Sequence, residues 1–357
     1  MTNKLTVKPA LTDHHPKSRN DKRPDMYPLR FEPLFRRYIW GGRRLAEVLD
    51  KPIGDQSAAE SWEVVDHQDD QSIVRFGDLA GKSLRDLIAG HGVDLIGDDL
   101  MKKISSDDLP GHLQNRFPLL LKFLDANRNL SVQVHPDDQF GATLSPPDLG
   151  KTEAWYVMHA DPGSKIYAGL KEGVTAESFR AAIESGETES TLHSFEPKQG
   201  DCVFIRAGTQ HAIGAGLLIA EIQQASNTTF RVYDWGRVGD DGQPRALHIE
   251  QAIQATDFDR GPIACEAPQA TDDPNWQTIV QCEKFSMKRG KFDAPVSLGG
   301  DGRFRIVAVT QGELTLADDP SGQPMKLSDT TLLPACLGPT TLTPGQGGAE
   351  VLEIFVP

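Results

Sequence analysis

Residues 200–214 read Gly-Asp-Cys-Val-Phe-Ile-Arg-Ala-Gly-Thr-Gln-His-Ala-Ile-Gly. An apolar run, Cys202–Ile205, lies between Gly200 and Gly208, and His211 follows three residues after the second glycine. Glycine adopts the backbone conformations of tight turns at little steric cost. The two glycines therefore allow the chain to turn at both ends of a short strand and return to a β-barrel, with the His211 side chain directed inward.

Residues 130–138, Leu-Ser-Val-Gln-Val-His-Pro-Asp-Asp, form a second informative stretch. Because side chains alternate between the two faces of a strand, its two valines point to one side and Ser131, Gln133 and His135 to the other. The apolar face packs, and the polar face offers an amide oxygen and an imidazole that are close enough to share one ion. A lone histidine in such a place is more often a polar residue at a barrel mouth, so the metal hypothesis depends on further ligands.

A carboxylate is the next ligand candidate, because Glu153 opens an otherwise apolar strand in residues 150–158, Gly-Lys-Thr-Glu-Ala-Trp-Tyr-Val-Met. By itself such a residue is usually a solvated charge. Together with Gln133, His135 and His211 it gives a mixed nitrogen and oxygen donor set with room for water or substrate, as catalytic metal sites have. We predict one ion per chain, with zinc favoured and manganese, iron or cobalt as alternatives.

Most of the remaining chain consists of short apolar runs separated by Gly, Pro and Asp, a pattern typical of β proteins. Strands are expected at 118–124, 130–134, 153–158, 165–168, 202–205, 217–223 and 230–233, and later at 278–282, 304–310, 313–316, 331–333 and 351–356. Helical signals are confined to 83–89 with 94–104, to 175–185 and to 248–255. The pattern predicts a mostly β fold with few helices.

The distribution of apolar residues also predicts how the chain is divided. Residues 1–25 carry few large apolar side chains and are expected to be a disordered tail. We expect a catalytic domain at 26–260, with a helical insertion around 80–115, and a linker rich in Pro, Ala and Asp at 261–276. A second β unit follows at 277–357.

Charge and cysteine content limit the possible partners. The chain has 37 Lys and Arg against 51 Asp and Glu, for a formal net charge of −14, so no long-range positive field would attract nucleic acid. A small phosphorylated substrate needs only a few local cations. The four cysteines lack a CxxC spacing, and no apolar run is long enough to cross a bilayer. We expect a cytoplasmic monomer or weak homo-oligomer without nucleic acid or membrane partners.

The stretch at 200–214 resembles the second cupin motif, with Gly200, Gly208 and His211 in register and Arg206 where a proline is usual. From about Tyr27 onward the chain resembles the type I mannose-6-phosphate isomerases. The resemblance is carried by Tyr38-Ile-Trp-Gly-Gly, Glu60-Ser-Trp-Glu, Phe117-Pro-Leu-Leu-Leu-Lys-Phe-Leu and Asn227-Thr-Thr-Phe-Arg-Val-Tyr-Asp-Trp-Gly-Arg. It implies tandem cupin (jelly-roll) barrels with a small helical insertion, and interconversion of mannose 6-phosphate and fructose 6-phosphate.

The resemblance also implies roles for individual residues. It assigns the zinc ligands to Gln133, His135, Glu153 and His211, the catalytic groups to Arg231, Lys151 and Glu221, and substrate contacts to Lys122 and Ser131. The C-terminal barrel has Leu-Leu-Pro-Ala-Cys-Leu-Gly at 332–338, where a ligand histidine might be expected, and is predicted to be metal-free.

Aldose–ketose isomerisation moves a proton between C1 and C2 through an enediol, which requires a base near those carbons and an electrophile for the developing oxyanion. Glu221 or Lys151 can carry the proton, and Arg231 can bind vicinal oxygens or a phosphate. Two other functions fit the same residues. One is a sugar- or metal-binding cupin without activity, and the other is a different cupin enzyme, such as an oxygenase or epimerase.

Overall fold

The computed structural model describes residues 26–239 and 242–357, and it confirms the predicted mostly β, cupin-type fold. No helix among the described residues combines the length and apolar character needed to cross a membrane. The tail predicted at residues 1–25 lies outside the described part of the chain.

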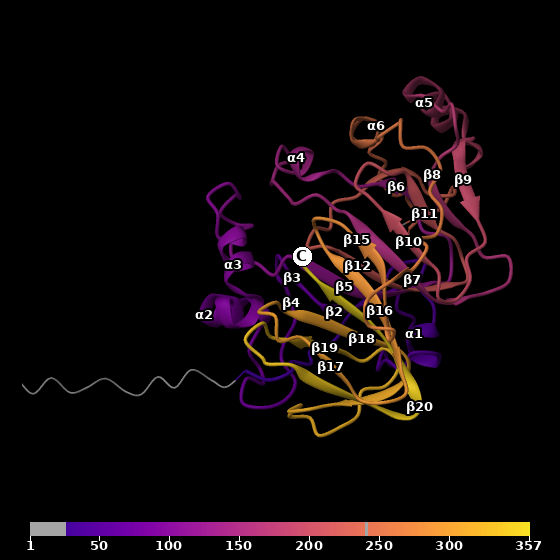
Figure 1. The fold of residues 1–357 in the computed structure, drawn as a ribbon. Coiled ribbons are helices and arrows are strands. Elements are labelled where there is room, and N and C mark those ends of the chain that lie inside the picture. Colours follow the sequence, from indigo (N-terminus) through magenta and orange to yellow (C-terminus); the bar gives the residue numbers. More distant parts are fainter. Residues whose placement is uncertain (1–25, 240–241) are drawn as a thin grey trace, which may run out of the picture.

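The N-terminal barrel is built from two antiparallel sheets, drawn mainly in indigo to magenta in Figure 1. The six-stranded sheet has the order β1-β2-β5-β12-β7-β10. Its strands span Leu34–Arg36, Glu60–Val64, Leu119–Ala126, Leu217–Gln224, Glu153–Ala160 and Cys202–Ile205. The five-stranded sheet has the order β13-β6-β11-β8-β9, with strands at Phe230–Tyr233, Val132–Val134, His211–Ile213, Ile166–Leu170 and Leu192–Phe195. A small hairpin, β3 (Asp66–His67) and β4 (Asp70–Gln71), follows β2.

The C-terminal unit is one seven-stranded antiparallel sheet in the order β14-β15-β16-β20-β18-β19, with β17 paired to β20. The strands are, in that order, Gln269–Ala270, Trp276–Gln281, Ser286–Phe292, Thr340–Phe355, Arg305–Leu316 and Thr330–Leu333, with β17 at Val296–Leu298. The prediction of two separate strands at 304–310 and 313–316 is wrong, because both segments belong to one strand, β18. The ladder continues across two register shifts on either side of Gly312, whose φ of 72° accommodates the irregularity.

Few helices decorate the sheets, as the sequence predicts. They are α1 (Arg44–Glu47), α2 (Leu84–Ile96), α3 (Asp98–Ile104), α4 (Asp138–Gly141), α5 (Ala176–Ser185) and α6 (Ile249–Ala255), with a 3₁₀ turn at Thr188–Thr191. At α5 the Thr175 side chain accepts from the Ser178 N–H, and Gly186 ends the helix in the left-handed conformation. Figure 1 shows α2 and α3 together to one side of the sheets.

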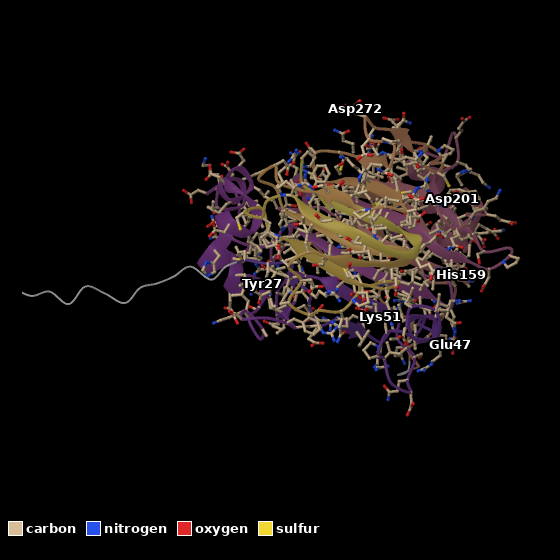
Figure 2. All side chains as sticks on the ribbon, turned by 60° about the horizontal axis from the view of Figure 1, so that its bottom comes forward. Tyr27, Glu47, Lys51, His159, Asp201 and Asp272 are labelled. Atoms are coloured by element: carbon tan, nitrogen blue, oxygen red, sulfur yellow. The ribbon has the colours of Figure 1, made fainter. Side chains whose placement is uncertain are left out.

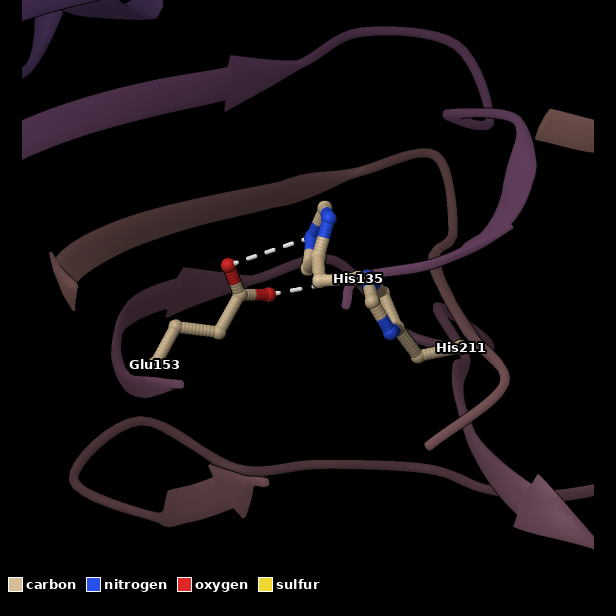
Figure 3. Close-up of side chains that lie close together, drawn as sticks. All are labelled: His135, Glu153 and His211. Atoms are coloured by element: carbon tan, nitrogen blue, oxygen red, sulfur yellow. Dashed lines mark ion pairs between the residues drawn. The ribbon is translucent and has the colours of Figure 1, made fainter. Parts of the chain in front are cut away.

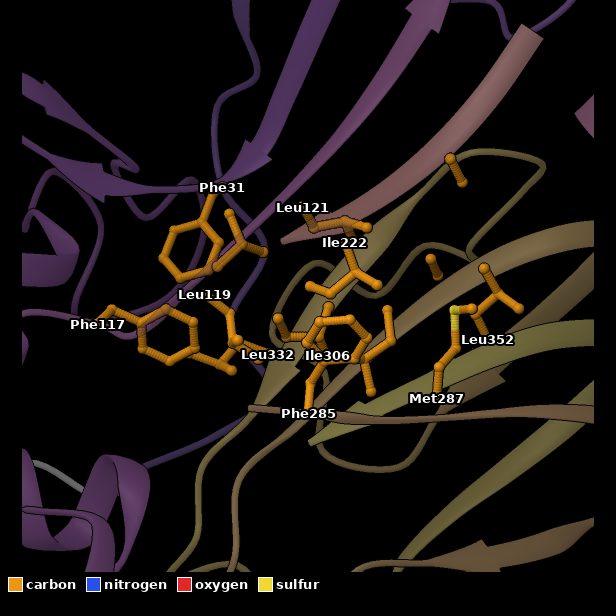
Figure 4. Close-up of a cluster of buried hydrophobic side chains, with 14 of the residues drawn as sticks. Phe31, Phe117, Leu119, Leu121, Ile222, Phe285, Met287, Ile306, Leu332 and Leu352 are labelled. Carbon is orange, nitrogen blue, oxygen red and sulfur yellow. The ribbon is translucent and has the colours of Figure 1, made fainter. Parts of the chain in front are cut away.

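Alternate residues of β5, β7 and β12 face two different cores. Leu119, Leu121 and Ile222 point outward and pack on residues of the C-terminal unit, among them Phe285 and Ile306 (Figure 4). The residues between them point into the barrel, and these include the charged side chains of the site. One apolar core therefore joins both units. The predicted division into domains, with boundaries at 260 and 277, stays a prediction.

A buried ion pair also connects the two units. The Lys51 ammonium lies 2.9 Å from Glu63 Oε2 and donates a hydrogen bond to the Ser328 carbonyl at 3.0 Å. Lys51 is labelled in Figure 2, which shows the side chains around the C-terminal sheet. The barrel that bears the site is therefore supported from outside by both apolar and ionic contacts.

Candidate functional site

Three strands of the five-stranded sheet hold site residues at one level. Gln133 on β6 is the register partner of His211 on β11 and of Arg231 on β13. Val132 and Val134, on the other face of β6, are fully buried in a separate apolar cluster. The alternation predicted from the sequence therefore directs Gln133 toward the barrel interior.

His135, Glu153 and His211 come together although they are far apart in the sequence (Figure 3). Their candidate ligand atoms all lie within 4.8 Å of one another, and each residue is only 1% exposed. Glu153 faces both rings, with Oε2 at 3.4 Å from His135 Nε2 and Oε1 at 3.5 Å from His211 Nε2. This convergence is what the sequence predicts for the three residues.

Backbone carbonyls orient the two imidazole rings. His135 Nδ1 donates to the Thr228 carbonyl, and His211 Nδ1 donates to the Thr209 carbonyl, both at 2.9 Å. A carbonyl can only accept, so each ring carries its proton on Nδ1, and each Nε2 presents a lone pair to the cluster.

The electrostatic environment keeps the rings neutral and the carboxylate charged. Burial, followed by the positive charge of Lys151, lowers the pKa of His135 to about 3. Burial is also the main cause that lowers the pKa of His211. Burial opposes ionisation of Glu153, but the positive charge of Lys151 outweighs it and holds its pKa well below the usual range. Neutral imidazoles and an ionised carboxylate are the protonation states that bind metal ions.

The residues present fit a divalent cation. The Lys151 ammonium donates to His135 Nε2 at 2.9 Å and to Glu153 Oε2, so the donor atoms already surround one positive charge. The amide of Gln133 lies 3.4 Å from His211 Nε2. A half-turn of that amide directs its oxygen to the cluster and its nitrogen to Ser131 Oγ, which gives a fourth donor.

Buried charges on the six-stranded sheet form a second group beside the cluster. Glu221 on β12 is the register partner of Lys122 on β5 and of Trp155 on β7. Lys122 Nζ lies 3.0 Å from Glu221 Oε1, while the Trp155 indole donates to Glu221 Oε2 at 3.0 Å. Lys151 Nζ is 3.7 Å from the same carboxylate.

Repulsion and burial perturb this second group as well. Burial, and then repulsion from Glu153, raises the pKa of Glu221 although Lys122 opposes the shift. Burial disfavours the charge on Lys122, but Glu221 and Glu60 outweigh it and raise its pKa. A raised pKa of a buried carboxyl group that lines a cavity is typical of groups that exchange protons with a substrate.

The donor and ionisable side chains described above, except that of His135, border one cavity of about 300 Å³. That volume is at the lower end of ligand pockets and suits a ligand of monosaccharide size. The cavity is lined by eight residues singled out from the sequence, Lys122, Ser131, Gln133, Lys151, Glu153, His211, Glu221 and Arg231. His135 lies behind this lining, against Lys151 and Glu153.

Ser131 connects the arginine to the ligand candidates. Arg231 Nε donates to Ser131 Oγ at 3.1 Å, and Ser131 Oγ donates to Gln133 Oε1 at 3.0 Å. Among the described residues no carboxylate forms an ion pair with Arg231. Its guanidinium is half-buried and borders the cavity, as expected for a residue on the polar face of β13.

The cavity also has lining residues to which the sequence assigns no role. Glu60 accepts from the Trp62 indole at 2.6 Å and lies 3.7 Å from Lys122. Its strand, β2, is buried on both faces, so no alternation marks it. Arg245 follows β13 in a segment without periodicity, and His248 stands at the start of the helix predicted at 248–255. Only the return of this segment to the sheet brings the two side chains to the cavity.

Comparisons with known proteins agree with these features. Residues 29–156 match the family described as phosphomannose isomerase type I, catalytic domain. The chain is 34% identical over 326 residues to mannose-6-phosphate isomerase ManA of Bacillus subtilis (strain 168), over 91% of this chain and 98% of that protein.

Two solved structures share the architecture. The mannose 6-phosphate isomerase from Bacillus subtilis superposes with a TM-score of 0.81 at 29% identity, over 92% of this chain and 99% of that one. A mannose 6-phosphate isomerase bound with zinc and yttrium has a TM-score of 0.70 at 15% identity, over 93% of this chain and 100% of that one. The second likeness is one of fold alone.

Proposed function

This chain belongs to the type I phosphomannose isomerase family, and we infer that it is an enzyme, a metal-dependent isomerase that interconverts mannose 6-phosphate and fructose 6-phosphate. The observation that carries this inference is the meeting of two groups at one cavity. A buried set of metal-type donors lies beside a buried set of ionisable groups suited to proton transfer.

We propose that one zinc ion is held by Gln133, His135, Glu153 and His211. The support is the donor chemistry, with two neutral imidazoles, one carboxylate and one amide in place, and a solved protein of the same fold that was crystallised with zinc. When bound, such an ion supplies a Lewis acid that polarises a sugar carbonyl and fixes its orientation. Each histidine is held by a backbone carbonyl, so little reorganisation is needed for binding.

We propose that Glu221 or Lys151 moves the proton between C1 and C2. Both line the cavity, and their charged groups lie 3.7 Å apart, so either can reach the same region of a substrate bound in the cavity. Lys122 holds the Glu221 carboxylate in place, and Lys122 and Ser131 are proposed to contact substrate hydroxyls. Arg231 is proposed to stabilise the negative charge that develops on the enediol oxygens.

A coupled assay on mannose 6-phosphate, together with metal analysis of the purified protein, tests the function. Turnover that depends on bound metal is expected. Binding of the sugar phosphate without turnover would instead identify a non-catalytic binding protein.

Two variants separate the candidate bases. Glu221→Gln and Lys151→Met should each keep the fold, and loss of the true base should lower kcat about 100- to 10,000-fold. Exchange of the C2 proton of mannose 6-phosphate with deuterated solvent reports on the same step. The variant that abolishes this exchange identifies the base, and exchange at the wild-type rate in both variants would exclude both residues.

A further inference from the structure

Arg245 and His248 line the cavity, yet neither takes part in the proposed isomerisation. The segment that bears them is fixed to β13. The Arg231 N–H donates to His248 Nδ1 at 3.3 Å, and the His248 N–H donates to the Arg231 carbonyl at 2.7 Å. Arg231 Nη1 also donates to the Ala246 carbonyl at 3.1 Å. The segment is therefore held to the edge of the sheet, and its side chains have fixed positions.

We call the segment that bears Arg245 and His248 the rim of the cavity. The groups that the rim offers to the cavity are hydrogen-bond donors. Because His248 Nδ1 accepts a backbone N–H, the neutral ring carries its proton on Nε2, which is then a donor. Arg245 uses Nε and Nη2 to bind the two oxygens of Asp234. Within 26–239 and 242–357 no acceptor binds Arg245 Nη1, so this end of the guanidinium is available to a ligand.

The rim also carries surplus positive charge. Asp234 is paired with two guanidinium groups, those of Arg237 and Arg245, so this clamp retains one positive charge. The neighbouring guanidinium of Arg231 adds a second positive charge, since no carboxylate in the described chain pairs with it. The protein as a whole has a formal net charge of −14, so the positive rim is a local feature. An acceptor-only anion such as phosphate matches both its charge and its donors.

The rim and the metal-type cluster lie at opposite ends of the Arg231 guanidinium. Arg231 Nε reaches toward the cluster through Ser131, Gln133 and His211, in successive contacts of 3.1, 3.0 and 3.4 Å. Arg231 Nη1 reaches in the other direction, to Ala246 beside the rim. A short phosphorylated molecule held at the rim can therefore extend past Arg231 to the cluster.

We propose that Arg245 and His248 bind the phosphate group of the substrate, and so determine the preference for phosphorylated over free sugars. The identity of the sugar rests on the proposed function, whereas the anion site rests on the rim itself. Arg245 and His248 are thus positioning residues for the isomerisation, distinct from the groups that act on C1 and C2.

The test compares Arg245→Met with Arg237→Met in the metal-loaded protein. Both changes leave Asp234 with one arginine, but only Arg245 lines the cavity. Arg245→Met should raise KM for mannose 6-phosphate and the inhibition constant of inorganic phosphate about 10- to 100-fold, as expected for the loss of a charge-assisted hydrogen bond, with kcat within about threefold. Arg237→Met should change neither constant by more than about twofold.

Equal effects in the two variants would overturn the proposal, because they would indicate loss of the Asp234 clamp and not of an anion contact. Unchanged constants in Arg245→Met, or a loss of kcat alone, would do the same. His248→Asn gives a second measurement if Arg245→Met does not fold. Asparagine can still accept the Arg231 N–H but lacks the donor at Nε2, and should raise both constants about 3- to 10-fold.

The two hypotheses can fail separately. If the wild-type protein does not isomerise mannose 6-phosphate, the proposed function is wrong. Calorimetric titration with inorganic phosphate still tests the rim in that case. Weaker binding by Arg245→Met than by Arg237→Met supports the anion site, and equal binding by the two overturns it.

Discussion

The Thr228 carbonyl accepts a hydrogen bond from His135 Nδ1 at 2.9 Å, and it thereby fixes the ring that presents Nε2 to Glu153. Thr228 is itself held by Asp148, whose Oδ2 accepts from the Thr228 hydroxyl at 2.7 Å and from the Ser226 hydroxyl at 2.9 Å. Asp148 lies three residues before Lys151, so one carboxylate connects two segments that border the site.

Asp148→Asn should weaken metal binding without removing a ligand. The amide nitrogen that replaces Oδ2 cannot accept from the two hydroxyls, so Thr228 and the His135 ring lose their support. Loss of such an outer contact typically lowers metal affinity about 10- to 100-fold. Competition with a zinc-binding dye measures the change. Asp293→Asn, at an exposed carboxylate, is the control, and an equal affinity in the two variants would show that Asp148 has no such role.

Asp148 also makes stability depend on pH. Burial opposes its ionisation, but hydrogen bonds from His67, Thr228 and Ser226 outweigh burial and lower its pKa. A lowered pKa in the folded state stabilises the protein above the unfolded value, about 3.9, and this contribution is lost as pH falls through the folded value. The free energy of unfolding of Asp148→Asn should therefore be about 1–3 kcal/mol below wild type at pH 7.

Urea unfolding from pH 7 down to pH 3.5 measures this dependence. The difference between wild type and Asp148→Asn should be constant above about pH 5 and should shrink below about pH 4. A difference that persists unchanged at the acid end would mean that the residue stabilises through packing and not through its charge.

The metal site should hold one ion per chain. Chelation should abolish turnover, and one equivalent of zinc should restore it, because the proposed donors converge at one place. His211→Asn should lose the ion, whereas His159→Asn, at a half-exposed ring paired with Asp161, should retain it. Elemental analysis provides the measurement. Two tightly bound ions, or full activity in excess chelator, would contradict a single site.

Much of the site could be predicted because local pattern determines it. The alternation in 130–138 directs Gln133 inward independently of the remainder of the chain. The strands β10 and β13 have the bounds that their apolar runs predict. The glycines around Cys202–Ile205 have φ values of 90° and 86°, which explains their presence at the two turns. These features depend on steric rules over a few residues.

The rest depends on tertiary contacts that no local pattern encodes. Glu60 lies on a strand covered on both faces, and its place in the group of buried charges emerges only from the proximity of Lys122. His248 reaches the cavity because its backbone N–H and its ring Nδ1 are both hydrogen-bonded to the backbone of Arg231, seventeen residues earlier. The join of two predicted strands into β18 likewise depends on its long partner, β20, which spans Thr340–Phe355.

Arg231 provides the sharpest test of catalysis against binding. Its Nε is hydrogen-bonded to Ser131 at 3.1 Å, its backbone is paired with Gln133, and no carboxylate in the described chain neutralises it. A fixed, uncompensated cation beside the reacting oxygens interacts more strongly with the charged transition state than with the neutral sugar. Loss of such an interaction lowers kcat and kcat/KM together.

Arg231→Ala should therefore retain its metal and fold, and lose about 100- to 1,000-fold in kcat with a modest change in KM. This outcome is opposite to that expected for Arg245→Met, which should raise KM and spare kcat. Steady-state kinetics of the two variants, with circular dichroism and metal content as checks, separate the roles. If Arg231→Ala raises KM alone, Arg231 belongs to the phosphate site, and the charge on the enediol oxygens is stabilised by other groups. If neither constant changes, the catalytic role proposed for Arg231 is wrong.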